Sequence, residues 1–230
     1  MAKVLRSEPQ EVAVFGIVRV NAYEDFFLER FRDIESYKKG TSIPQVKKFS
    51  TPPRIEDVQQ LTVDREDFDA LKNCRVGSCD VKLSAQATAR LQKEIDWNAP
   101  GASVQVNELA RASLLEYVNR YLSGGNKALT EYSDKKTTLR LADEFASILN
   151  ASPYIYDYEP EFYAYLRSTG GIRSTQAFIT LSSFSLGFGG SLPNFHTEMP
   201  DLLGATKKVW RKSIAVRRWN RKKSPHAWNV

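Results

Sequence analysis

The chain has 230 residues, of which 42% are hydrophobic and 26% are charged, a composition typical of a globular protein with a real apolar core. No apolar run approaches the roughly 20 residues that a membrane-spanning helix needs, which excludes a helical membrane protein. Residues 1–10 also lack the apolar stretch of a signal peptide. As written, the sequence therefore predicts a cytoplasmic protein.

The positive charge is concentrated at the C-terminal end. Residues 1–165 contain 22 Lys and Arg and 25 Asp and Glu, a net charge of −3, whereas residues 166–230 contain 11 and 2, a net charge of +9. Three of the four tryptophans and both histidines also lie in this last part. Such a shift indicates a domain boundary, a functional basic arm or a segment of foreign origin.

A strand and a helix are predicted near the N-terminus. Residues 11–20 carry many β-branched side chains on two alternating faces, which is typical of a buried strand. Asn21 can cap the helix that follows, and Gly40 can end it. The apolar residues of this helix recur at helical spacing: Phe26, Phe27, Phe31 and Ile34. Residues 45–50 then predict a short strand between prolines.

A helical block occupies the middle of the chain. A helix is predicted from Ser84 to about Trp97. The strongest helical pattern covers residues 106–122, where two adjacent rows of mainly apolar side chains at i, i+4 spacing indicate a central buried helix. Shorter helices are predicted over residues 141–150 and 159–166.

The composition changes again beyond residue 168. Gly- and Ser-rich stretches there interrupt the hydrophobic periodicity, and the chain ends in a basic segment. We therefore expect an α+β, helix-rich fold with an N-terminal strand and helix, a helical block and an irregular C-terminal region. We expect one α+β domain over residues 3–166 and a basic tail over residues 167–230.

Three long stretches of the chain carry a resemblance to a known family: VAVFGIVRVNAYEDFFLERFRDIESYKKG, FSTPPRIEDVQQLTVDREDFDALKNCRVGSCDVKLSA and YLSGGNKALTEYSDKK followed by LADEFASILNASPYIYDYEPEFYAYL. They resemble an uncharacterised family of bacterial proteins over about residues 3–166. The order of elements in that family is similar to START-like helix-grip proteins, which hold apolar ligands. The resemblance implies a non-enzymatic, START-like domain for an apolar small molecule. It implies no catalytic residue, metal or cofactor.

The chain departs from this family after about residue 166. Family members look longer at both ends and commonly begin with an export signal. The abrupt departure suggests a shifted reading frame or a fusion, and the start at Met1 suggests a fragment of a longer exported protein. On that interpretation, the absent signal and the excess positive charge are incidental.

Two cysteines are separated by four residues that include a glycine, and their spacing leaves three alternatives open. Cys74 and Cys79 can close a small disulfide loop in an exported protein or remain as two free thiols in a reducing compartment. Metal or redox chemistry is the third alternative. A zinc site would need two further ligands, and the chain offers only His196 and His226, far away in sequence.

An aromatic-rich segment supplies the candidate ligand-binding residues. The side chains that could line a pocket for an apolar ligand are Tyr154, Tyr156, Phe162 and Tyr165. The alternative is that these rings belong to the core, with Phe162 and Tyr165 packed against the helix over residues 106–122.

The basic tail supports a second function, the binding of a nucleic acid or an anionic membrane surface. Its cations could neutralise phosphates and its indole rings could stack on bases. The candidate residues are Lys207, Lys208, Trp210, Arg211, Arg217, Arg218, Trp219 and Arg221. If the reading frame is shifted, these residues have no function.

Acidic residues are frequent near positions 64–69 and 157–161, and paired carboxylates can act as general acids in hydrolases. No base or metal ligand accompanies them in the sequence. We therefore interpret them as acids of helix starts and solvated faces, which the helix dipole stabilises.

Overall fold

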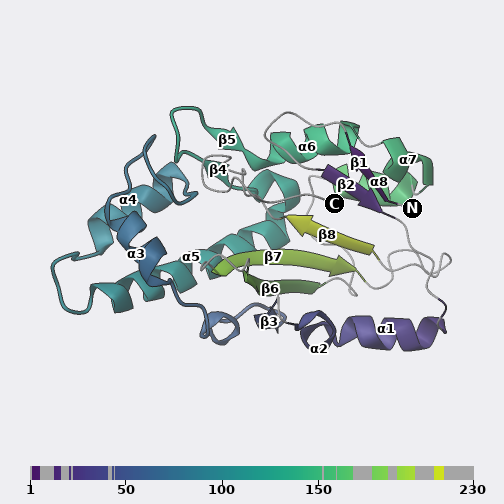
Figure 1. Ribbon diagram of the computed structural model, residues 1–230, viewed down its shortest axis with the longest axis horizontal. Coiled ribbons are helices and arrows are strands. Elements are labelled where there is room, and N and C mark those ends of the chain that lie inside the picture. Colours follow the sequence, from purple (N-terminus) through teal and green to yellow (C-terminus); the bar gives the residue numbers. More distant parts are fainter. Residues whose placement is uncertain are drawn as a thin grey trace, which may run out of the picture.

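The fold is α+β and rich in helices, as the sequence predicted (Figure 1). The computed structural model describes residues 2–5, 13–16, 21, 23–40, 43, 45–151, 153–158, 160–167, 178–185, 191–199 and 210–214. The N-terminal elements are β1 (Ala2–Leu5), β2 (Ala13–Gly16), α1 (Glu24–Arg32), α2 (Ile34–Lys38) and β3 (Gln45–Lys48). The helical block begins with η1 (Ile55–Val58), α3 (Arg65–Lys72), α4 (Ala85–Glu94), α5 (Ala102–Gly124) and η2 (Gly125–Ala128). It continues through β4 (Glu131–Tyr132), β5 (Leu139–Arg140), α6 (Leu141–Ala151), α7 (Pro153–Tyr158) and α8 (Pro160–Arg167).

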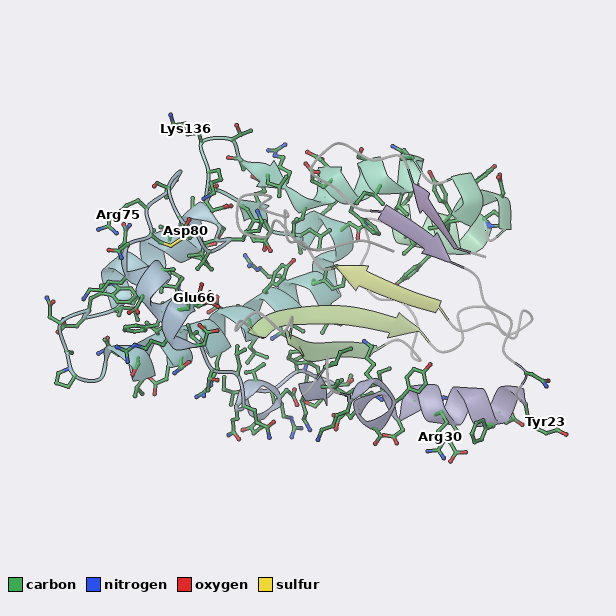
Figure 2. All side chains as sticks on the ribbon, viewed as in Figure 1. Tyr23, Arg30, Glu66, Arg75, Asp80 and Lys136 are labelled. Carbon is green, nitrogen blue, oxygen red and sulfur yellow. A yellow bond between two sulfur atoms is a disulfide. The ribbon has the colours of Figure 1, made fainter. Side chains whose placement is uncertain are left out.

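The predicted N-terminal strand corresponds to β2, which forms an antiparallel pair with β1. The predicted helix is divided into two, because Asp33 has φ −82° and ψ 55°, outside the helical region, and separates α1 from α2. Tyr23 and Arg30 project into solvent from this part of the chain (Figure 2), and the Arg30 guanidinium lies 5.4 Å from the centre of the Phe26 ring. Ile34, at the start of α2, is buried.

Three strands lie within the part of the chain where the sequence predicted irregular structure: β6 (Phe178–Ser185), β7 (Ser191–Met199) and β8 (Trp210–Ile214). They form an antiparallel sheet in the order β3-β6-β7-β8, with Val46 opposite Ser182. Ile179 and Leu181 alternate with polar residues in β6, a period-2 pattern that favours a strand and that the Gly- and Ser-rich surroundings obscured. The expectation of irregular structure is therefore corrected for these residues, and the sheet joins them to β3.

Helix α5 is the central helix of the helical block, as its two apolar rows predicted. Val106 and Leu109 lie in one buried cluster, with side chains of α3, α4 and the segments that follow each of these helices. Val118 and Tyr121 lie in a second cluster, which also contains Val58 of η1 and residues around β5. Because both clusters share one helix, α5 links them along its length (Figure 1).

Side-chain caps fix the starts of α3 and α4. Ser84 Oγ accepts a hydrogen bond from Ala87 N at 3.0 Å, which confirms the predicted helix start. Asp64 Oδ1 accepts one from Asp67 N at 2.8 Å and caps α3, a helix that the sequence interpretation missed. The acids of this segment are therefore those of a helix start, and the exposed Glu66 lies in the first turn (Figure 2).

The predicted helices over residues 141–150 and 159–166 correspond to α6 and α8. An additional short helix, α7, lies between them. The sequence predicted no helix between these two, but Pro153 is tolerated in the first turn of α7, where its missing N–H would have no helical partner. Leu149 of α6 and Leu166 of α8 form a third buried cluster with half-buried neighbours such as Phe145 and Tyr165.

Among the described helices, none has both the length and the hydrophobicity that crossing a bilayer requires.

Candidate ligand-binding site

A pocket of about 170 Å³ opens between η2, α6 and α8, and we refer to it as the α6–α8 pocket. Five of the eight described residues that line it are apolar: Ala142, Phe145, Ala146, Leu149 and Leu166. The other three are polar or charged: Asn126, Lys127 and Arg167. An apolar wall with a few polar groups is the usual lining of a small-molecule site.

One face of α6 supplies most of the apolar wall. Its four lining residues are spaced three and four positions apart, so they share one side of the helix. Ala142 and Ala146 carry only methyl groups, whereas Phe145 and Leu149 are large, and the small residues leave room beside the large ones. Leu149 and Leu166 are both buried and form the apolar contact between α6 and α8 at the pocket.

The turn at the end of α5 positions the polar side of the pocket. Gly125 has φ 57° and ψ −137°, a conformation that favours glycine, and it redirects the chain from α5 into η2. Asn126 of η2 is buried, and its Nδ2 donates a hydrogen bond to the carbonyl oxygen of Leu166 at 2.8 Å. This bond ties η2 to the last turn of α8, where a carbonyl has no partner within the helix. Lys127 follows immediately and is exposed at the rim.

Arg167 is held at the opposite rim by side chains of α6 and α8. Its Nη1 donates hydrogen bonds to Asn150 Oδ1 at 2.9 Å and to the Tyr163 hydroxyl at 3.0 Å. Its guanidinium carbon also lies 5.6 Å from the centre of the Tyr163 ring, within range of a cation–π contact. The Arg167 side chain is therefore oriented even though it is exposed.

Of the predicted aromatic residues, Tyr156 and Tyr165 have described side chains, and neither of these two lines the pocket. Tyr165 packs with Leu149 and Leu166, where the sequence predicted packing against α5, and burial raises the pKa of its hydroxyl. Tyr156 is 59% exposed, and its ring meets that of Tyr163 edge-on, with 5.4 Å between their centres. The side chains of Tyr154 and Phe162 lie outside the described residues.

The sequence indicated a binding site in this region of the chain, but it did not predict the residues that line the pocket. The missed signal is the row Ala142, Phe145, Ala146 and Leu149, in which small and large apolar residues alternate along one helix face. The contribution of η2 carried no local signal, because it depends on contact between residues 40 positions apart.

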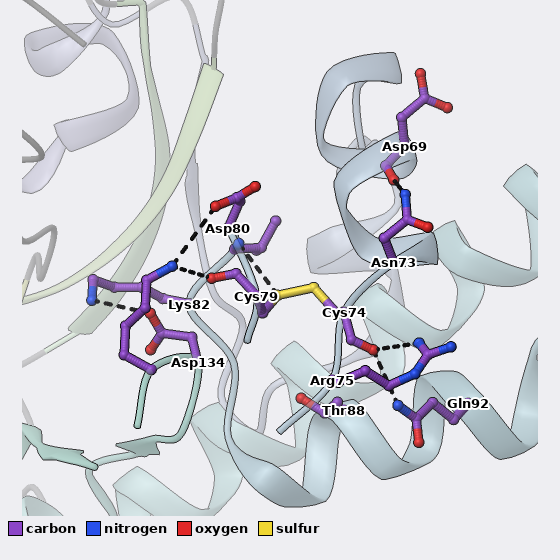
Figure 3. The surroundings of a disulfide bond; sticks show 12 residues. Asp69, Asn73, Cys74, Arg75, Cys79, Asp80, Lys82, Thr88, Gln92 and Asp134 are labelled. Carbon is purple, nitrogen blue, oxygen red and sulfur yellow. Dashed lines mark hydrogen bonds and ion pairs between the residues drawn. A yellow bond between two sulfur atoms is a disulfide. The ribbon is translucent and has the colours of Figure 1, made fainter. Parts of the chain in front are cut away.

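A disulfide joins Cys74 and Cys79, whose Cα atoms are 4.5 Å apart (Figure 3). Both cysteines are buried among apolar side chains of α3, α4 and α5. The loop that they close turns at Gly77, whose φ of 82° lies in the left-handed region. A buried disulfide is shielded from attack by other thiols, so this one is suited to a structural role.

Hydrogen bonds tie the disulfide loop to the segment after β4. Gly77 N donates to the Ser133 carbonyl at 2.7 Å, and Cys79 N donates to the Asp134 carbonyl at 2.9 Å. The buried carboxylate of Asp134 also pairs with Lys82 at 3.8 Å (Figure 3). The described residues contain no group of three or more His, Cys, Asp or Glu side chains arranged to hold a metal ion.

The candidate residues of the basic tail fall largely outside what the structure describes. Trp210 and Arg211 belong to β8, where they lie opposite Met199 and Glu198 of β7, and only their backbone is described. The remaining candidates lie outside the described residues: Lys207, Lys208, Arg217, Arg218, Trp219 and Arg221.

No family model matches the chain, and searches of curated proteins and of solved structures also found no match.

Proposed function

We propose that the protein is a non-enzymatic small-molecule-binding protein that holds the apolar part of its ligand in the α6–α8 pocket. The observation that carries the proposal is the combination of five apolar lining residues with polar groups from η2 and α8. Apolar ligands are also what the resemblance to START-like proteins implies.

The size of the pocket limits what it can hold. Cavities of roughly 150 Å³ lined by apolar side chains can take up benzene, whereas drug-sized ligands occupy roughly 300 Å³ or more. At about 170 Å³, the α6–α8 pocket suits one six-membered ring or a short branched chain.

Toluene, a neutral probe of this size, tests the proposal. We expect it to shift the methyl NMR signals of Leu149 and Leu166 in a saturable manner. Ala146→Leu should abolish the shifts because the larger isobutyl side chain fills the pocket. Ser147→Leu adds a comparable group at an exposed neighbouring position that does not line the pocket, so this variant should bind like the original protein. Absence of saturable shifts, or equal binding by the Ala146→Leu protein, would contradict the proposal.

A second candidate function is favoured by the net charge of +9 over residues 166–230. On this alternative, the tail binds nucleic acid or an anionic membrane surface. Affinity for a DNA duplex or for phosphatidylserine vesicles should then fall steeply with salt and disappear when residues 205–230 are deleted. Weak binding that is insensitive to this deletion would exclude the alternative.

A further inference from the structure

We infer that the α6–α8 pocket selects small carboxylates, with an aromatic ring or short branched chain against α6 and the carboxylate at Arg167 and Lys127. This inference rests on the proposed function and adds the chemical class of the ligand. Among the described residues that line the pocket, two are cations and none is Asp or Glu.

The two cations are not neutralised by acids in the described part of the chain. None of the ion pairs found there includes Lys127 or Arg167. A ligand anion would therefore meet positive charge without having to displace a protein carboxylate. Because Lys127 comes from η2 and Arg167 from α8, the charges approach the pocket from two elements.

Arg167 is prepared to receive a carboxylate. Its Nη1 is engaged by Asn150 and Tyr163, and the Tyr163 ring lies under the guanidinium. Among the described residues, Nε and Nη2 have no hydrogen-bond partner, which leaves one edge of the planar fork for the two oxygens of a carboxylate. Such paired, charge-assisted hydrogen bonds are stronger than those of a neutral amide. Holding the side chain in advance also reduces the entropy lost on binding.

One opposing feature is the negative end of the α8 dipole, which would repel an anion. At the pocket this effect is reduced, because the Leu166 carbonyl already accepts the hydrogen bond from Asn126 Nδ2. The apolar wall then selects the rest of the ligand. A ring fits between Phe145, Leu149 and the alanines, whereas the limited volume cannot hold the whole of a long acyl chain.

Phenylacetate and phenylacetamide test the inference, because they have nearly the same shape and differ in charge. We expect the full-length protein to bind phenylacetate about tenfold more tightly by methyl NMR titration. Arg167→Gln should remove most of this preference and Lys127→Gln part of it. Lys136→Gln removes an equal charge from an exposed residue outside the pocket and should leave the preference unchanged (Figure 2).

The outcomes separate the inference from the proposed function. Equal affinities for the two probes, or a preference that survives both variants, would overturn the carboxylate inference while toluene binding still supports an apolar site. If toluene also fails to bind, the proposed function fails and the inference fails with it. Spectra of the unliganded variants that match the original protein away from the pocket exclude misfolding as the cause of a lost preference.

Discussion

Asn126 donates a buried hydrogen bond from its side-chain amide to the backbone carbonyl of Leu166, 40 residues further along the chain. The bond connects the turn after α5 to the last turn of α8, and both residues line the same pocket. A side chain thus supplies the partner that a terminal helix carbonyl lacks, and it sets the position of η2 relative to α8.

We predict that Asn126→Ala lowers the free energy of unfolding by about 1–3 kcal/mol, because the buried Leu166 carbonyl loses its donor. Urea denaturation measures the change. The matched control is Asn119→Ala on the exposed side of α5, where Asn119 Nδ2 donates to the Leu115 carbonyl at 3.1 Å. Water can replace that bond, so the control should change stability by about 0.5 kcal/mol or less. Equal effects of the two variants would show that the Asn126 bond has no special role.

Helix α5 provides a second matched pair. Val118 is fully buried, whereas Val104, on the same helix, is 58% exposed. We expect Val118→Ala to lower the free energy of unfolding by about 1–3 kcal/mol, because the substitution leaves a cavity. Val104→Ala should change the free energy of unfolding by about 0.5 kcal/mol or less, or stabilise the protein slightly, because alanine has a higher helix propensity than valine. Near-zero destabilisation by Val118→Ala in thermal or urea unfolding would show that this face of α5 is not part of the core.

The elements that could be predicted from the sequence are those whose signals are local. Ser84 specifies the cap of α4, and the two apolar rows specify the buried face of α5. Each signal lies within a short stretch of sequence, and both features are present in the structure. The C-terminal strands were missed because their evidence is partly non-local: β6 lies beside β3, with Lys48 opposite Thr180. Strand pairing over such a separation leaves only a short period-2 pattern in the sequence.

The pocket, too, could be predicted only in part from local sequence signals. The aromatic residues near position 160 indicated the correct region, but the cavity exists because Leu166 meets Leu149 and because the turn at Gly125 brings η2 to them. Contacts of this kind follow from packing between helices, which no single stretch of sequence contains. The sequence also could not decide whether Cys74 and Cys79 form a disulfide, because their spacing in the sequence does not fix the distance between their Cα atoms.

The disulfide should stabilise the protein by about 2 kcal/mol, the value that chain entropy gives for so short a loop. We therefore expect the Cys74→Ala, Cys79→Ala double variant to unfold at a lower urea concentration. In the variant, amide hydrogen exchange should accelerate at positions 77 and 79, because in the original protein the N–H groups of Gly77 and Cys79 donate to Ser133 and Asp134 from the closed loop. Unchanged exchange at both amides would indicate that the hydrogen bonds, and not the disulfide, hold the loop in place.

Asp57 should make the stability depend on pH. Its Oδ2 accepts hydrogen bonds from Ser50 N at 3.0 Å, Ser50 Oγ at 2.7 Å and Arg54 N at 2.8 Å. Burial alone would raise the pKa of Asp57, but these hydrogen bonds and the charge of Lys47 outweigh burial and hold the pKa below its ordinary value of 3.8. The ionised carboxylate thereby ties the end of β3 to η1, whose Val58 is buried in the core.

A lowered pKa in the folded state means that ionised Asp57 stabilises the fold at pH values above the pKa of the unfolded chain, and that this contribution is lost as the pH falls through the folded pKa. Asp57→Asn should therefore be less stable than the original protein near pH 7, and the difference should shrink toward pH 2. Urea midpoints measured across this range test the prediction. Ser50→Ala removes the hydroxyl hydrogen bond but keeps the carboxylate. Near neutral pH, the stability of this variant should therefore lie between the stabilities of Asp57→Asn and the original protein. A difference between Asp57→Asn and the original protein that stays constant from pH 7 to pH 2 would show that the carboxylate stabilises the fold by its shape and not by its charge.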